Sequence, residues 1–220
     1  YHKYIELLNH HIQLKWNRDT SKTYFDCTNY YFEIDLENDF LKKGPSKENH
    51  KGPILGQALM LDANQIPIGM QLYPGNQSEK PFLRKMISDM KDRYNVSGKT
   101  IQIADKGLNC AKNIYAASIE ANDGYIFSKS IHGNGLSDIE KKWLLLSDND
   151  SNLWSDVRDK NGRLIFKYKS CIDNFNYSFD DDEGKKVIFS IKEKRIVTYN
   201  PSLARKKLRE IEKEVEKVSL

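Results

Sequence analysis

The chain has 220 residues, 39% hydrophobic and 30% charged, a balance that excludes a disordered chain and suits one large domain or a domain with an insertion. Its formal net charge of +4 permits a nucleic-acid partner without requiring one. No apolar run approaches the ~18 residues of a membrane-spanning helix, and no signal-peptide pattern opens the chain, so we expect no membrane partner.

Three scattered cysteines, Cys27, Cys110 and Cys171, form no C-x-x-C pair. An odd count without a disulfide framework is typical of a reducing compartment, so we expect a cytoplasmic protein with small buried thiols. Because the sequence opens on Tyr1 rather than Met, we expect it to be part of a longer protein.

The first elements are a helix, a strand and a loop. Residues 1–18 carry Ile5, Leu8, Ile12 and Trp16 close to one helical stripe, which predicts a short helix packed on the body. Residues 22–33 are rich in strand-favouring side chains, and the polar stretch 35–53 predicts a loop.

A hairpin and a helix follow. Residues 54–61 and 66–72 predict two strands, the second with strict apolar alternation, joined by a turn at 62–65. Ser78 is a good N-cap for a helix that we expect to run to Tyr94.

The pattern then alternates between strands and helices. Residues 100–105 and 124–130 predict short strands on either side of a helix over 109–122. Three meander-like strands followed by alternating helices and strands indicate an α/β fold, so we expect 1–130 to be the first part of its core.

Beyond residue 130 the character changes. Strand-like runs separated by turns predict a β-rich insertion over 131–199, with the acidic run 180–184 as a solvated hairpin turn rather than a calcium site. Residues 200–220 predict an amphipathic helix capped by Asn200 or Ser202, with its apolar stripe docked on a core. That stripe steps 4-3-4-3 through Ala204, Leu208, Ile211, Val215 and Val218.

Two acids stand out in this pattern. Asp26 interrupts a strand, where carboxylates are depleted, and Asp105 ends the short strand 100–105. Ligands bind at the strand ends of α/β sheets, and two carboxylates from adjacent strands repel unless a divalent cation joins them. Mg²⁺ and Mn²⁺ prefer such oxygen ligands, and two ions can clamp a phosphodiester; Asp26 would then bridge both ions and Asp105 complete one.

A purely structural reading of the two acids is also open. Asp105 could cap the "KGL" turn that follows it, and Asp26 could face solvent on an exposed sheet face. Spacing alone does not decide between the metal reading and this one.

Three segments carry a family resemblance: "YFDCTNYYFEIDLENDFLKKGPSKENHKGP", "ILGQALMLDANQIPIGMQLYPGNQSE" and "IQIADKGLNCAKNI". Together they resemble the DDE-type transposases of bacterial insertion sequences, in the branch with a β-rich insertion. The resemblance covers most of 20–130, and the hairpin segment is its most specific part. It implies an RNase H-like mixed sheet flanked by helices, with a β-rich insertion.

The same resemblance implies roles and partners. Asp26 and Asp105 correspond to the first two acids of the catalytic triad, and Thr28 falls in the family's D-x-T position. The complete enzyme would use two Mg²⁺ or Mn²⁺ ions to cleave transposon ends and transfer the strand to target DNA. It would act as a homodimer on the bacterial nucleoid, within the cytoplasm.

The chain departs from the family at the third acid, a Glu on a helix with a Tyr…Arg…Glu pattern after the β-rich insertion. No such pattern occurs here. The last helix carries several Glu residues, but its alternating charges look like a paired solvent face. We therefore expect the third carboxylate beyond residue 220 and little catalysis by this fragment.

Two alternatives remain open. Glu79, at the start of the helix after the hairpin, could complete a ribonuclease H-like nuclease site within the chain; a first-turn acid favoured by the helix dipole is the simpler reading. The chain could also be a non-catalytic relative that only binds DNA.

DNA contacts are expected from basic residues near the two acids. The loop after the first strand offers Lys42, Lys43, Lys47 and Lys51, and Lys106 directly follows Asp105. Neutralising phosphates needs such clusters, although a run of charges is more often a solvated loop.

Overall fold

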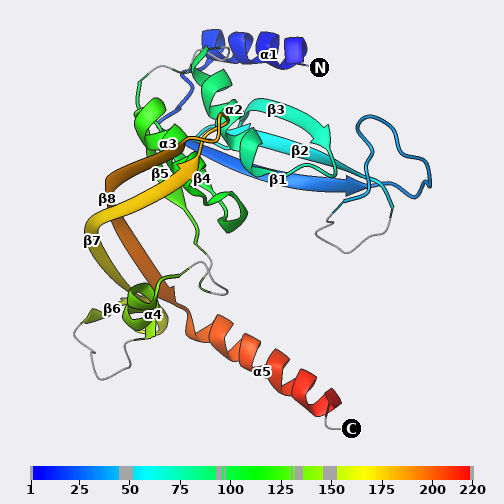
Figure 1. Ribbon diagram of the computed structural model, residues 1–220. Helices are drawn as coiled ribbons and strands as arrows, with labels where there is room; N and C mark the ends of the chain where they lie inside the picture. The colour runs from blue at the N-terminus through cyan, green and yellow to red at the C-terminus, as the bar shows by residue number, and fades with distance from the viewer. Residues whose placement is uncertain are drawn as a thin grey trace. The chain divides into compact units, whose positions relative to one another are not determined.

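The computed structural model describes residues 2–44, 52–92, 96, 98–129, 131, 136–145 and 153–218. The chain divides into two compact units, Tyr1–Ser130 and Ile131–Leu220, and each is described by itself (Figure 1). Within the described part of the chain, no helix is both long and apolar enough to cross a membrane.

A five-stranded mixed sheet forms the centre of the first unit. Its strands are β1 (Lys22–Tyr31), β2 (Ile54–Leu61), β3 (Pro67–Pro74), β4 (Ile101–Ala104) and β5 (Gly124–Phe127), in the order β3-β2-β1-β4-β5. The pairs β1–β2 and β2–β3 are antiparallel, whereas β1–β4 and β4–β5 are parallel. This strand order and these directions are those of an RNase H-like core, which confirms the predicted fold class.

The helices of this unit are α1 (His2–Lys15), α2 (Lys80–Asp92), η1 (Lys106–Leu108), α3 (Ala111–Tyr115) and η2 (Ala116–Glu120). The helix predicted over 109–122 is present as one continuous helical stretch over 111–120, formed by α3 and η2. Cys110 is extended at the N-cap of α3, and from Ala116 the helix widens into a π-helix. The buried side-chain amide of Asn113 donates to the carbonyl of Leu108 and so ties α3 back to η1.

One face of the sheet carries the core. Phe25 and Cys27 of β1 are buried on that face, while the residues that alternate with them are less buried or exposed. The side chains of α2 complete the core, so α2 covers this face. The buried residues of this core are Phe25, Cys27, Ala58, Met60, Ile68, Tyr73, Leu83, Met86, Ile87, Val96, Ala104, Leu108 and Ala117.

The helix α1 packs on β3 as expected, but through only part of the face predicted for it. Ile5 and Ile12 of the predicted stripe are half-buried, whereas Leu8 and Trp16 are 59% and 64% exposed and do not pack on the body as expected. Asn9 is buried beside them, and its side-chain amide donates to the carbonyl of Ile68 on β3. A polar contact to the backbone of β3, which hydrophobic periodicity cannot register, sets the rotation of this helix.

The second unit is built on a three-stranded antiparallel sheet of β6 (Ser155–Arg158), β7 (Leu164–Asp180) and β8 (Lys186–Tyr199). The acidic run forms the β7–β8 turn as expected: the carboxylate of Asp181 accepts the backbone N–H groups of Glu183 and Lys185. A helix, α4 (Asp138–Leu145), was not predicted in this β-rich region, although Ser137 and Glu140 form a capping box at its start.

Cations hold α4 to this sheet. The ammonium of Lys169 on β7 donates to the carbonyls of Trp143 and Leu144 and lies 5.2 Å and 4.8 Å from the ring centroids of Trp143 and Trp154. Arg195 on β8 pairs with Glu140 of α4. The helix is therefore anchored mainly through charge-assisted contacts.

The last helix, α5 (Pro201–Val218), is capped as predicted: the side-chain carbonyl of Asn200 accepts the backbone N–H groups of Ser202 and Leu203. The expectation that its apolar stripe docks on a core is wrong. Leu208, Ile211 and Val215 are 56%, 58% and 59% exposed. The 4-3-4-3 spacing marks a face that can be buried, but it does not say that the same unit buries it.

Candidate functional site

The register of β1 against β4 brings Asp26 and Asp105 together. Thr23 pairs with Gln102 and Phe25 pairs with Ala104, and each acid is the next residue along its strand direction. Neighbouring strands are about 4.8 Å apart, so the two backbones run side by side where the acids leave them. Both side chains point away from the core face, because Phe25 and Ala104 point into it.

Asp26 is held by its own strand. Its carboxylate Oδ1 accepts the backbone N–H of Cys27 at 2.8 Å, and its backbone lies opposite Leu59 of β2. The side chain is exposed, as is that of Thr28, two residues further along the same face. A rigid central strand thus presents one carboxylate and one hydroxyl to solvent.

Asp105 continues the line of β4 before the chain turns into η1. Its backbone is extended (φ −76°, ψ 170°), and its carbonyl accepts the N–H of Leu108 at 3.0 Å. Its exposed carboxylate makes no capping hydrogen bond to η1, so the turn does not need the acid. The structural reading of Asp105 as the cap of "KGL" is therefore wrong.

Two further residues lie close to this edge of the sheet. A carboxylate oxygen of Glu79 is 3.7 Å from the position that a Cβ on Gly107 would occupy, two residues after Asp105. Tyr73 is 2% exposed, and burial raises the pKa of its hydroxyl, to which the Cys27 thiol and the Glu79 and Asp26 carboxylates add. Tyr73 belongs to the core with Cys27, so it lies on the other face of the sheet from the exposed Asp26.

The donor set suits a hard divalent cation in part. Two exposed carboxylates at neighbouring positions are oxygen ligands of the kind that Mg²⁺ and Mn²⁺ prefer. Among the described residues, no three His, Cys, Asp or Glu side chains gather closely enough to form a metal site. The described chain thus offers two ligands, and a third would have to come from elsewhere or from a shift of Glu79.

The basic residues proposed for DNA contact lie at different places. Lys106 is exposed and opens η1 directly beside Asp105. Lys42 bridges Ile54, whose partner on β1 is Tyr31, so it lies level with the far end of that strand, about 17 Å beyond Asp26 at the usual rise per residue. Lys43 donates its backbone N–H to Glu37, and Lys47 and Lys51 lie outside the described residues.

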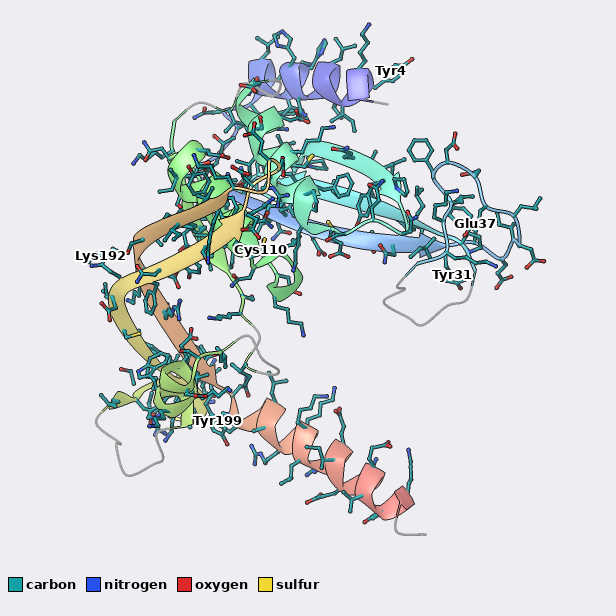
Figure 2. The ribbon with its side chains drawn as sticks, viewed as in Figure 1. Tyr4, Tyr31, Glu37, Cys110, Lys192 and Tyr199 are labelled. Carbon is teal, nitrogen blue, oxygen red and sulfur yellow. The ribbon has the colours of Figure 1, made fainter. Side chains whose placement is uncertain are left out.

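The loop that carries Lys42 and Lys43 is also acidic and aromatic. Figure 2 labels Tyr31, at the end of β1, and Glu37 within this loop. Acids alternate along it at Glu33, Asp35, Glu37 and Asp39. The described part of the loop therefore does not form a basic patch around its two lysines.

Two solved structures resemble the chain at low identity. One is a cryo-EM structure of the piggyBac transposase synaptic complex with hairpin DNA: identity is 9%, the TM-score is 0.42, and the match covers 79% of this chain and 33% of that one. Another is a Mos1 transposase paired-end complex with left transposon end, with 11% identity, a TM-score of 0.35, and coverage of 55% and 39%.

The chain therefore spans 33% and 39% of the lengths of these two proteins. No protein-family model matches its sequence, and no curated protein matches it. The strand order and directions of β1–β5 identify the fold.

Proposed function

We propose that this chain is a catalytic-core fragment of a DDE-type transposase from a bacterial insertion sequence. The supporting observation is the β1–β4 register, which sets Asp26 and Asp105 at equivalent positions on neighbouring parallel strands. The RNase H-like sheet and the family resemblance of residues 20–130 support the same reading. The reaction would be cleavage of DNA at transposon ends, followed by strand transfer to target DNA.

In this proposal Asp26 and Asp105 hold the divalent ions, which would supply an activated oxygen nucleophile and neutralise charge at the phosphate. Thr28, on the same face as Asp26, would donate its hydroxyl to a phosphate oxygen. Lys106 would contact the DNA backbone beside the site, whereas Lys42 and Lys43 would reach a more distant phosphate. A homodimer acting on bacterial DNA in the cytoplasm completes the proposal.

The decisive test measures Mn²⁺ binding to the chain by isothermal titration calorimetry. We expect weak binding that is lost in Asp26→Asn and in Asp105→Asn, since each variant removes one of two carboxylates. Asp92→Asn, at the exposed end of α2, makes the same chemical change away from the site and should bind Mn²⁺ like the parent. Equal binding by all three variants would rule the site out.

A second candidate is a ribonuclease H-like hydrolase in which Glu79 completes the site. It is favoured by the position of the Glu79 carboxylate against Gly107, which follows Asp105 by two residues in the chain. The two candidates differ in what the chain does alone. Metal-dependent nucleic-acid cleavage by these 220 residues, abolished by Glu79→Gln, would favour the hydrolase; metal binding without cleavage, unaffected by Glu79→Gln, would favour the transposase fragment.

A further inference from the structure

The helix α5 exposes an apolar stripe between Ala204 and Val215. Leu208, Ile211 and Val215 are each more than half exposed, and Ala204 extends the stripe by one step. The 4-3 spacing of these four residues places them at alternate d and a positions of a heptad repeat, with Leu208 and Val215 at a. Such a seam is narrow and suits one partner helix.

The charges of α5 are segregated along its axis. Residues 201–209 carry four basic and no acidic side chains, whereas residues 210–218 carry four acidic and two basic ones. This order opposes the helix dipole, which favours acids near the N-terminus and bases near the C-terminus. The arrangement thus weakens the isolated helix, and a neighbouring helix of opposite direction would compensate for it.

We propose that α5 pairs with α5 of a second copy of this chain as an antiparallel two-stranded coiled coil. When Leu208 of one copy packs against Ile211 of the other, Ala204 packs against Val215, and the same layers recur by symmetry. The residues that flank this seam then meet their opposites. Lys207 faces Glu214 of the second copy, and Arg205 faces Glu212 of the second copy, so that four attractive pairs form and no like charges meet.

A parallel pairing of the same helices is less complementary. In that arrangement the flanking positions pair five residues apart, so Lys207 still meets Glu212 of the second copy, but Arg205 and Glu214 face uncharged residues. A parallel pair would also bring the two basic N-terminal halves of the helices together and the two acidic C-terminal halves together. Charge complementarity therefore selects the antiparallel form.

Within the single chain Lys207 already bonds Glu210 at 2.6 Å and Lys217 bonds Glu214 at 2.8 Å, all four side chains being largely exposed. These i,i+3 contacts contribute little, and an ammonium has further donors to share, so they do not compete strongly with the pairing. This pairing would give the homodimer of the proposed function its interface, but it is argued from the surface of α5 alone, so it can fail while the metal site of Asp26 and Asp105 stands.

Sedimentation equilibrium of the 220-residue chain over a wide range of concentrations tests the pairing. We expect a reversible monomer–dimer equilibrium that Ile211→Asp abolishes. Lys207→Glu should raise the dissociation constant roughly tenfold, because two attractive pairs become repulsive. The double variant Lys207→Glu with Glu214→Lys should recover the parent value, since it exchanges the partners of one antiparallel pair.

Lys206→Glu is the matched control, because it makes the same change of charge outside the seam and should leave the dissociation constant unaltered. Circular dichroism would confirm that each variant keeps its fold. Recovery by Lys207→Glu with Glu212→Lys instead would show a parallel pairing and overturn the antiparallel one. A monomer at all concentrations, or a dimer insensitive to Ile211→Asp, would overturn the interface itself.

Discussion

Asp26 and Asp105 leave neighbouring parallel strands at equivalent positions, each one residue beyond the Phe25–Ala104 pair. In the proposed site, a shared divalent cation would remove the repulsion between these two exposed carboxylates. We therefore expect Mn²⁺ to raise the melting temperature. At a free Mn²⁺ concentration one hundred times the dissociation constant, the free energy of unfolding should rise by about 2.7 kcal/mol.

Thermal unfolding followed by circular dichroism, with and without Mn²⁺, measures this stabilisation. Asp105→Asn should abolish the shift caused by the metal, whereas Asp92→Asn should preserve it. A shift that survives Asp105→Asn would place the metal elsewhere in the chain.

Gly56 is required for the packing of Tyr73. The two residues are register partners on β2 and β3, and a Cβ at Gly56 would lie 2.1 Å from Cε2 of the Tyr73 ring. Because Tyr73 is buried and stacked on Phe82 at 4.1 Å, the ring has little room to move. We expect Gly56→Ala to lower the free energy of unfolding by about 1–3 kcal/mol, the usual cost of overpacking.

Urea denaturation of Gly56→Ala, Tyr73→Leu and the double variant measures the coupling between these positions. If the steric conflict is the cause, the double variant should lose much less stability than the two single losses together. Full additivity would show that Gly56 matters for another reason.

Arg18 and Asp62 form a buried ion pair between the segment after α1 and the β2–β3 turn. Their side chains are 3% and 0% exposed, Nε and Oδ2 are 3.3 Å apart, and the other carboxylate oxygen accepts the N–H groups of Asn64 and Ile66. Removing the guanidinium would leave a buried carboxylate without its cation. We expect Arg18→Leu to cost about 3–5 kcal/mol of unfolding free energy.

An exposed pair in the second unit provides the comparison. Lys141 and Asp138 are 3.4 Å apart with side chains 46% and 92% exposed, so Lys141→Leu should change stability by less than about 0.5 kcal/mol. Similar losses in urea denaturation for the two variants would contradict a special role of the buried pair.

Lys169 is a buried cation that holds α4 against β7. Its ammonium lies near two of the three tryptophans of the chain, Trp143 and Trp154, so intrinsic fluorescence reports on this contact. We expect Lys169→Met to shift the emission to longer wavelength and to cost about 2 kcal/mol, as carbonyls at the end of α4 lose their donor.

The control for this experiment is Lys167→Met on the same strand. Lys167 is the register partner of Tyr199, and among the described residues it makes none of the hydrogen bonds or cation–π contacts that Lys169 makes. An unchanged emission spectrum in Lys169→Met would show that α4 does not depend on the lysine.

The second unit should lose stability in strong alkali through Tyr177. Burial, followed by the hydrogen bond to Glu193 at 2.6 Å, raises the pKa of Tyr177 to about 12. The unfolded chain releases this proton near pH 10. The stabilisation is therefore complete below about pH 10 and disappears as the pH rises through 12.

The measurement is the unfolding free energy of the parent and of Tyr177→Phe between pH 9 and pH 12. We expect the difference between them to shrink by about 1–2 kcal/mol across this interval, after allowance for partial solvent screening. A difference that stays constant would mean that the hydroxyl titrates alike in the folded and unfolded chains.

Local sequence patterns predicted most strands of the central sheet. Apolar alternation in residues 54–72 predicted the β2–β3 hairpin and its turn at Asp62, because strand periodicity and turn chemistry act over a few residues. The helix predicted over 109–122 is present over 111–120, but the sequence did not predict its π-helical half. Its π-helical second half and the tie from Asn113 to Leu108 arise from contacts with the folded core, which helix propensity does not contain.

For the candidate site, the sequence by itself determined the identity of the two acids, since Asp26 and Asp105 are conspicuous where each stands in its strand. Only the tertiary structure decided that they are neighbours: their separation along the chain is bridged by the parallel β1–β4 register, a long-range pairing that depends on the intervening hairpin and α2 packing on the sheet. Likewise, residues 204–218 determined an amphipathic helix, but its exposed stripe depends on which surfaces fold against it.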